Sequence, residues 1–221
     1  MFLEIPALLN AAEIARLNLL AREVNFVEGR LSNPANDTKN NLQADTTDPR
    51  YAESSQLVAA AFARSREFRD FAFPKRFAPP LLSRYEPGMK YGVHADSAYM
   101  PLVGGGAIRS DLSCTVFISD PAAYEGGELA VHLGARPNLF TGAPGSAIVY
   151  PSTTLHEVLP VRSGARLVSL TFIESAVPDQ TKRNLLYELN EIGALEGLNM
   201  QWQSRVRLEA VRQNLLRMWS S

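Results

Sequence analysis

The chain has 221 residues, with 22 Lys plus Arg against 23 Asp plus Glu, which is enough for one domain with a buried core and an extension. The balanced charge argues against a surface for nucleic acid or anionic membrane, and no uncharged apolar run approaches the ~20 residues of a membrane span. A single cysteine, Cys114, cannot form an internal disulfide, and the first residues lack the basic segment of a signal peptide. We therefore expect a cytoplasmic protein.

The first 80 residues carry the pattern of helices that cover a sheet. Asn10 followed by Glu13 has the spacing of a capping box, which predicts a helix start. The apolar residues that follow recur at helical spacing: Ile14, Leu17, Ala21 and Val24. A second helix is expected over residues 52–71. Its inward positions are Leu57, Ala61 and Phe68.

Residues 25–50, between these two helices, are rich in Asn, Asp, Thr and Gly. This composition is typical of irregular chain. Within the segment, Lys39-Asn-Asn-Leu-Gln is polar without being low in complexity, and composition favours a solvated loop.

From Leu81 to Glu174 the pattern changes to short strands separated by Gly and Pro, as in a sandwich or barrel. One such strand places alternate apolar residues on one face: Leu112, Cys114, Val116 and Ile118. The turn Glu125-Gly-Gly-Glu128 predicts a hairpin into the next strand. A turn at Ser163-Gly164 predicts a strand that begins at Arg166 and lies antiparallel beside the segment carrying His156.

His94 and Asp96 are two residues apart, so on an extended chain both side chains leave the same face. An imidazole and a carboxylate can hold a divalent transition metal if a third ligand comes from elsewhere. Only three histidines are present, so that ligand is His132 or His156. His156 follows the apolar run 146–150, and two His with one carboxylate form the ligand set of non-haem Fe(II) oxygenases.

Arg166 lies ten positions after His156. An arginine beside such a metal site suggests a two-pronged ion pair with a cosubstrate carboxylate. A structural ion pair at the mouth of the barrel is the alternative. Tyr85 and Tyr91 could hydrogen-bond in the cosubstrate pocket or pack in the core. Arg109 and Asp111 share a strand face and could pair with each other.

After Pro178 the periodicity is helical again, so residues 176–221 form a C-terminal helical extension. Two apolar stripes are expected, one of Leu185, Leu186, Leu189 and Ile192, the other of Val206, Val211, Leu215 and Met218. Because no heptad repeat persists, helices packed on the barrel are favoured over a dimerisation zipper. An oligomer formed through these helices remains open.

The ordered motifs of the chain resemble those of the bacterial PKHD-type hydroxylases, relatives of the prolyl 4-hydroxylase catalytic domain among the Fe(II)/2-oxoglutarate dioxygenases. The motifs are Tyr85-x-Pro-Gly, His94-x-Asp96, Arg109-Ser-Asp-Leu-Ser, Tyr124-Glu-Gly-Gly-Glu-Leu, Tyr150-Pro-Ser, Leu155-His156 and Gly164-x-Arg166. Lys39-Asn-Asn and Asn214-Leu-Leu-Arg-Met-Trp219 also look like that family, so the resemblance covers almost the whole chain.

The resemblance implies an α+β protein with a double-stranded β-helix, or jelly-roll, over residues 81–175. Residues 1–80 would be its helical buttress. It also implies iron ligation by His94, Asp96 and His156, with 2-oxoglutarate and O₂ as cosubstrates and ascorbate (vitamin C) as a further candidate. The cosubstrate-binding residues would be Arg166, through the distal carboxylate, and Tyr85. No catalytic residue beyond the metal centre is expected, and His132 lacks a companion carboxylate at ligand spacing.

Two departures from the family pattern bear on which substrate the protein binds. Phe172-Ile-Glu174-Ser stands where Trp-Ile-Gln-Ser is expected, and the short segment after Asp96 carries Gly104-Gly-Gly106. We expect Ser97–Ile108 to be a substrate lid hinged at these glycines, although a passive connection has the same composition. A peptidyl proline, a free amino acid and another small molecule all remain open as substrates.

Three other functions are compatible with parts of the pattern. A cupin-type metalloenzyme without 2-oxoglutarate would share the barrel but would give Arg166 no purpose. A non-enzymatic metal or 2-oxoglutarate sensor would keep the fold without turnover. A nucleic-acid demethylase of the same superfamily would need a basic groove with stacking aromatics, which the charge balance argues against.

Overall fold

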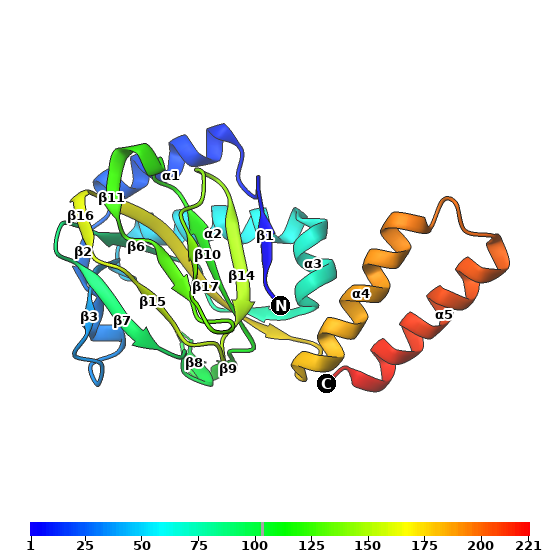
Figure 1. The fold of residues 1–221 in the computed structure, drawn as a ribbon. Coiled ribbons are helices and arrows are strands. Elements are labelled where there is room, and N and C mark those ends of the chain that lie inside the picture. The colour runs from blue at the N-terminus through cyan, green and yellow to red at the C-terminus, as the bar shows by residue number, and fades with distance from the viewer. Residues whose placement is uncertain (103) are drawn as a thin grey trace.

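A computed structural model describes residues 1–102 and 104–221. Its centre is an antiparallel eight-stranded sheet, in which β5 (Pro74–Phe77) pairs with the longest strand, β17 (Figure 1). The order of the other strands is β1 (Leu3–Ile5), β14 (Ala147–Pro151), β10 (Leu112–Phe117), β17 (Arg166–Ser175), β6 (Leu81–Tyr85), β4 (Leu42–Ala44) and β2 (Phe26–Glu28).

A second, five-stranded sheet completes the jelly roll. Its order is β13 (Asn138–Phe140), β12 (Leu129–Val131), β15 (His156–Val158), β7 (Lys90–His94) and β3 (Lys39–Asn40). Side chains from both sheets form one apolar cluster, which includes Phe117, Val131, Ile148, Val158 and Val168. The interior between the sheets is therefore closed by packing from both sides.

Three helices cover the large sheet through a second apolar cluster that joins Leu17, Phe62 and Phe68 to strand β10. These helices are α1 (Ala11–Glu23), α2 (Pro49–Arg64) and α3 (Arg66–Ala72). The capping box predicted at Asn10 is confirmed. The single helix predicted over 52–71 is instead two helices, because the Ser65 side chain caps a new helix by accepting from the Phe68 amide.

The composition of residues 25–50 predicted irregular chain, and this prediction is wrong. They form β2, the 3₁₀ helix η1 (Gly29–Ser32), β3 and β4. Strands β2 and β4 extend the large sheet, whereas β3 forms an edge of the smaller one. Such short strands are held by backbone hydrogen bonds to neighbours distant in sequence, so their own residues carry little strand signal.

The hairpin predicted at Glu125–Glu128 is also wrong. Strand β11 (Tyr124–Gly126) pairs with β16 (Val161–Gly164), while β12 pairs with β13 and β15. A side chain at Gly127 would lie 2.9 Å from the Arg166 Cδ atom, so this glycine allows close approach between strands. Strand β17 lies between β10 and β6 in the large sheet, not beside β15 as predicted.

The C-terminal helices α4 (Gln180–Glu196) and α5 (Trp202–Trp219) form a hairpin that projects away from the two sheets (Figure 1). Helix α4 packs against α3, and α5 packs against α4. The expectation that both helices pack on the barrel is therefore wrong for α5, none of whose residues is buried. Among the residues that the structure describes, no helix has the length and apolarity needed to cross a membrane.

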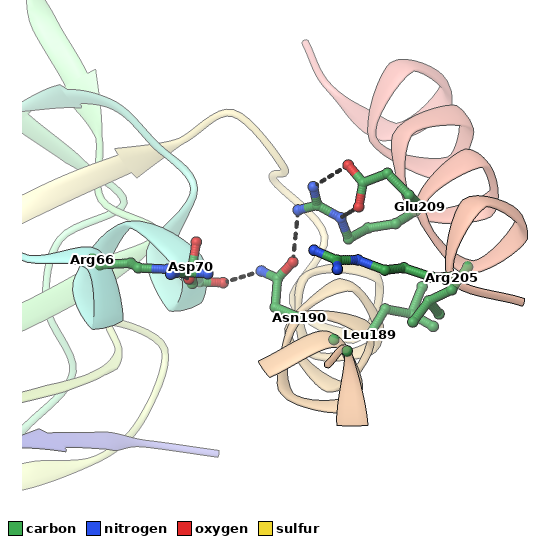
Figure 2. Close-up of a pocket in the computed structure, with 10 residues that line it drawn as sticks. Arg66, Asp70, Leu189, Asn190, Arg205 and Glu209 are labelled. Carbon is green, nitrogen blue, oxygen red and sulfur yellow. Dashed lines mark hydrogen bonds and ion pairs between the residues drawn. The ribbon is translucent and has the colours of Figure 1, made fainter. Parts of the chain in front are cut away.

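A polar pocket lies where this hairpin meets α3 (Figure 2). The Asn190 amide donates to the Asp70 carbonyl at 2.7 Å and accepts from Arg212 at 2.8 Å, and Arg212 also pairs with Glu209. These contacts hold the hairpin against the body of the protein. None of the predicted site residues lines this pocket.

Candidate metal centre

The structure brings the three predicted metal ligands together. His94 on β7 and His156 on β15 are direct cross-strand partners, and Asp96 follows two residues after β7 ends. His94 Nε2 lies 3.9 Å from Asp96 Oδ1, and His156 Nε2 lies 3.6 Å from Asp96 Oδ2. The ligand atoms of the three residues lie within 4.8 Å of one another, so a single ion could contact all three.

Both imidazoles are oriented from behind by the backbone. His94 Nδ1 lies 2.7 Å from the Gly92 carbonyl oxygen, and His156 Nδ1 lies 3.0 Å from that of Thr154. A proton on each Nδ1 leaves the two Nε2 atoms as free lone pairs that face the carboxylate. Burial, followed by the charge of His156, lowers the pKa of His94 to about 4, which keeps it in the neutral, metal-binding form at neutral pH.

An irregularity in β7 places a tyrosine against this site. Between the pairs His156–His94 and Val158–Tyr91, two residue steps on β15 correspond to three on β7. Tyr91 and His94 consequently face the same side, and their rings stack with centroids 3.6 Å apart. The Tyr91 hydroxyl accepts from the Asn33 side chain at 2.9 Å, which fixes the ring that supports His94.

A buried serine, Ser113, holds the Asp96 carboxylate and belongs to a row of three buried serines. Ser113 Oγ donates to Asp96 Oδ2 at 2.5 Å and lies 2.7 Å from Ser152 Oγ, which also bonds Ser110 Oγ at 2.7 Å. The Asp96 backbone amide donates to the Ser152 carbonyl at 3.3 Å. Ser110 and Ser113 are close in sequence, and Ser152 lies on a distant segment that the pairing of β10 with β14 brings beside them. Sequence reasoning did not identify their role.

Arg166 enters the interior from the opposite sheet. The residue is 1% exposed, and within residues 1–102 and 104–221 its Nε and Nη2 atoms have no hydrogen-bond partner. Its guanidinium carbon lies 5.3 Å from the centre of the Tyr85 ring and 5.8 Å from that of Phe117. Burial lowers the pKa of Arg166, as expected of a cation without an anionic partner.

Two tyrosines line the Arg166 site. Tyr85 is buried, and burial raises its pKa to about 12, so it stays a neutral phenol beside the guanidinium. Tyr124 also interacts with Arg166 through its side chain. Tyr85 was predicted here, but Tyr124 was not, because only the pairing of β11 with β16 brings it to this site.

The other predicted residues lie outside the cluster. His132 forms a contact of 3.3 Å with Glu157. Arg109 and Asp111 pair with each other as expected, through bonds of 2.7 and 2.9 Å. Glu174, one of the departures from the family pattern, holds Arg76 and accepts from the Arg109 amide at 3.3 Å, so it fastens strands rather than lining the metal cluster.

The segment expected to be a lid is a β-hairpin. β8 (Tyr99–Pro101) pairs with β9 (Ala107–Arg109), and the Gly105 amide donates to the Leu102 carbonyl in the turn between them. The predicted hinge at Gly104–Gly106 is wrong, because the glycines form the tip of the hairpin rather than its base. Val103, part of the predicted apolar tip, lies outside the described residues.

Comparisons with known proteins agree with this geometry. Residues 80–174 match a family model described as the 2OG-Fe(II) oxygenase superfamily. A PKHD-type hydroxylase of Sphingopyxis alaskensis is 51% identical over 212 residues, which cover 96% of both chains. A second, from Stenotrophomonas maltophilia, is 36% identical over 225 residues, covering 100% of this chain and 99% of its relative.

Solved structures show the same fold at low sequence identity. A viral collagen prolyl hydroxylase from Paramecium Bursaria Chlorella virus-1, in complex with 2OG, has a TM-score of 0.54 at 18% identity, covering 79% of this chain and 96% of that one. A Trichoplax adhaerens prolyl hydroxylase has a TM-score of 0.56 at 15% identity, covering 83% and 86%. The predicted jelly roll is thus confirmed. The chain belongs to the PKHD-type hydroxylases, within the Fe(II)- and 2-oxoglutarate-dependent oxygenases.

Proposed function

We propose that His94, Asp96 and His156 bind Fe(II) and that Arg166 binds the distal carboxylate of 2-oxoglutarate. The observation that carries this proposal is a cluster of three ligand side chains on one sheet, with a buried guanidinium on the other sheet whose Nε and Nη2 have no partner among the described residues. The protein then hydroxylates an unactivated C–H bond of a small-molecule or peptide substrate.

The donor set fits Fe(II). Two neutral imidazoles and one carboxylate occupy one side of an ion and leave its other side open for a cosubstrate and O₂. The unpartnered Arg166 nitrogens fit a carboxylate, which accepts two parallel bonds from one guanidinium. When bound, iron and 2-oxoglutarate supply the oxidation of the C–H bond, with succinate and CO₂ as the other products.

The residues of the chain position these groups and exclude water. The Gly92 and Thr154 carbonyls keep both imidazoles in the tautomer that exposes Nε2, and Ser113 fixes the carboxylate. Arg166 stays protonated at any working pH, so it holds the cosubstrate without a protonation switch. The apolar side chains between the sheets keep the site dry, which strengthens this ion pair.

Turnover without any added substrate tests the proposal. Wild-type protein with Fe(II), 2-oxoglutarate and O₂ should slowly form succinate as 2-oxoglutarate is consumed, and omission of iron should stop it. The variant His132→Ala, which changes the one histidine outside the cluster, should match wild type. Succinate formation that is absent, or that does not depend on iron, would overturn the proposal.

A second test concerns the serine that holds the carboxylate. Ser113→Ala removes the donor to Asp96 Oδ2 while leaving every proposed ligand in place. Because loss of an outer partner typically costs ~10–100-fold in metal affinity, anaerobic Fe(II) titration should show a weakening in this range. The matched control Ser119→Ala removes a serine on the same chain segment that bonds the Ala165 carbonyl instead. Equal Fe(II) affinity in Ser113→Ala and wild type would show that Ser113 does not hold a ligand.

Two kinds of substrate are supported by what solved relatives bind. The Trichoplax prolyl hydroxylase is in complex with a hypoxia inducible factor peptide fragment. HygX from Streptomyces hygroscopicus, with a TM-score of 0.54, binds nickel, 2-oxoglutarate and hygromycin B. A peptide and a small polar molecule are therefore both compatible with this fold.

A further inference from the structure

A buried lysine lies beside the proposed iron site. Lys39 on β3 is the cross-strand partner of Tyr91 on β7 and is 6% exposed. Its ammonium donates to Ser32 Oγ at 2.6 Å and lies 5.2 Å from the centre of the Tyr91 ring. The solvated loop predicted for this segment is thus wrong for Lys39.

The lysine is linked to the metal cluster through Tyr91. Tyr91 stacks on His94, so ammonium, phenol and imidazole form a continuous row from η1 to the proposed metal ligands. The Asp96 carboxylate is near enough to favour the charged form of Lys39. At the other end of the row, Ser32 is exposed, so a group from solvent could reach the ammonium.

This ammonium has no counter-ion among the residues that the structure describes. Throughout the described part of the chain, no carboxylate oxygen lies within 4.0 Å of Lys39 Nζ. The Lys39 ammonium has three N–H donors, and one of them bonds Ser32 Oγ. Burial lowers the pKa of Lys39 to about 8, and the Asp96 charge opposes this shift. Buried charges in proteins are normally paired, so Lys39 resembles Arg166 in lacking a protein anion.

The balance of charge indicates what is missing. On the proposed function, a divalent ion and Arg166 offset Asp96 and the two carboxylates of 2-oxoglutarate. The Lys39 ammonium is then the one positive charge of this set that no negative charge offsets. A carboxylate supplies a single negative charge, whereas a phosphate group would exceed it with about −1.5 to −2.

We propose that Lys39 and Ser32 form a subsite for a carboxylate of the substrate. This inference rests on the proposed function and narrows it: the protein hydroxylates a carboxylate-bearing substrate, with the acid group held at Lys39, one side chain away from the proposed metal ligand His94. The acid group belongs to a free amino acid or to a peptide.

Formate is the smallest probe of such a subsite. It should be titrated into protein already loaded with Mn(II) and 2-oxoglutarate, which occupy the metal and Arg166. Lys39→Met removes the charge and keeps an unbranched side chain. Because a hydrogen bond to a charged group contributes ~1.5–3 kcal/mol, formate affinity should fall at least about tenfold. Lys39→Arg should retain part of it, and neutral formamide should bind wild type more weakly than formate.

Lys90→Met is the matched control. Lys90 is an exposed lysine on β7, and its cross-strand partner is Asn40, the residue that follows Lys39. It should leave formate affinity unchanged. Equal formate affinity in wild type and Lys39→Met would overturn the proposal. A Lys39→Met variant that loses affinity only for 2-oxoglutarate would also overturn it, because Lys39 would then belong to the cosubstrate site.

Two larger probes separate the sources of the acid group. Alanine carries the carboxylate of a free amino acid, and N-acetylaspartate α-amide carries that of an acidic peptide. The probe that binds wild type more tightly, and loses that affinity in Lys39→Met, identifies whether the subsite takes a free amino acid or an acidic peptide. Failure of the proposed function would appear separately, as wild-type protein that binds neither Mn(II) nor 2-oxoglutarate.

Discussion

Asp96→Ala is expected to lose Fe(II) binding. Asp96 is the only anionic member of the cluster, and its removal leaves two neutral imidazoles to hold a divalent ion. Loss of an outer partner costs ~10–100-fold in metal affinity, so loss of the carboxylate itself should exceed about 100-fold. Anaerobic calorimetry with Fe(II) measures the effect directly, and succinate formation should disappear with it.

Asp37→Ala is the control, because Asp37 is an exposed aspartate outside the cluster. It should bind Fe(II) as wild type does. A thermal melt of metal-free Asp96→Ala should show a cooperative transition, since the apolar clusters are untouched. Unaltered Fe(II) affinity in folded Asp96→Ala would mean that the ion binds elsewhere.

Arg166→Ala is expected to raise the KM for 2-oxoglutarate steeply and to leave Fe(II) affinity nearly unchanged. The guanidinium is buried with unpartnered nitrogens, and it lies on β17, away from the strands of the metal cluster. Loss of one partner of a buried charge pair typically costs ~2–5 kcal/mol, which is about 30-fold to several-thousand-fold in affinity. Arg166→Lys should fall between, because an ammonium keeps the charge without the two-pronged geometry.

The comparison variant for this experiment is Arg162→Ala, which removes an exposed arginine from the neighbouring strand β16. Its KM for 2-oxoglutarate should equal that of wild type. If Arg166→Ala also keeps the wild-type KM, the guanidinium is a structural element of the barrel and the cosubstrate binds differently.

The proximity of His94, Asp96 and His156 was predictable because its signal is local. His94 ends strand β7 and Asp96 follows two residues later, so the two stay close along the chain, and His156 stands at the start of a strand after an apolar run. Arg166 was predicted to start a strand beside the segment of His156. It does start a strand, β17, but this strand lies in the opposite sheet, so Arg166 reaches the interior from across the barrel. Position along a strand is encoded locally, whereas strand order is decided by pairings over long distances.

Residues whose roles depend on such pairings could not be predicted. Ser113 and Ser152 are unremarkable strand and turn residues until β10 and β14 lie side by side. Lys39 stands in a polar stretch, and its burial follows from the pairing of β3 with β7 and from η1 above it. A side chain's partners on other strands decide its role, and those partners are not written beside it in the chain.

The direct pairing of His94 with His156 has a consequence for folding. The two residues are 62 positions apart, so the ion-binding pair exists only after β7 and β15 have joined in correct register. A slip of one residue would turn one imidazole to the outside of the barrel. On the proposed function, iron is therefore acquired after the sheet has formed, and binding to the native state alone stabilises that state by mass action. The free energy of unfolding should then rise with the concentration of free Fe(II).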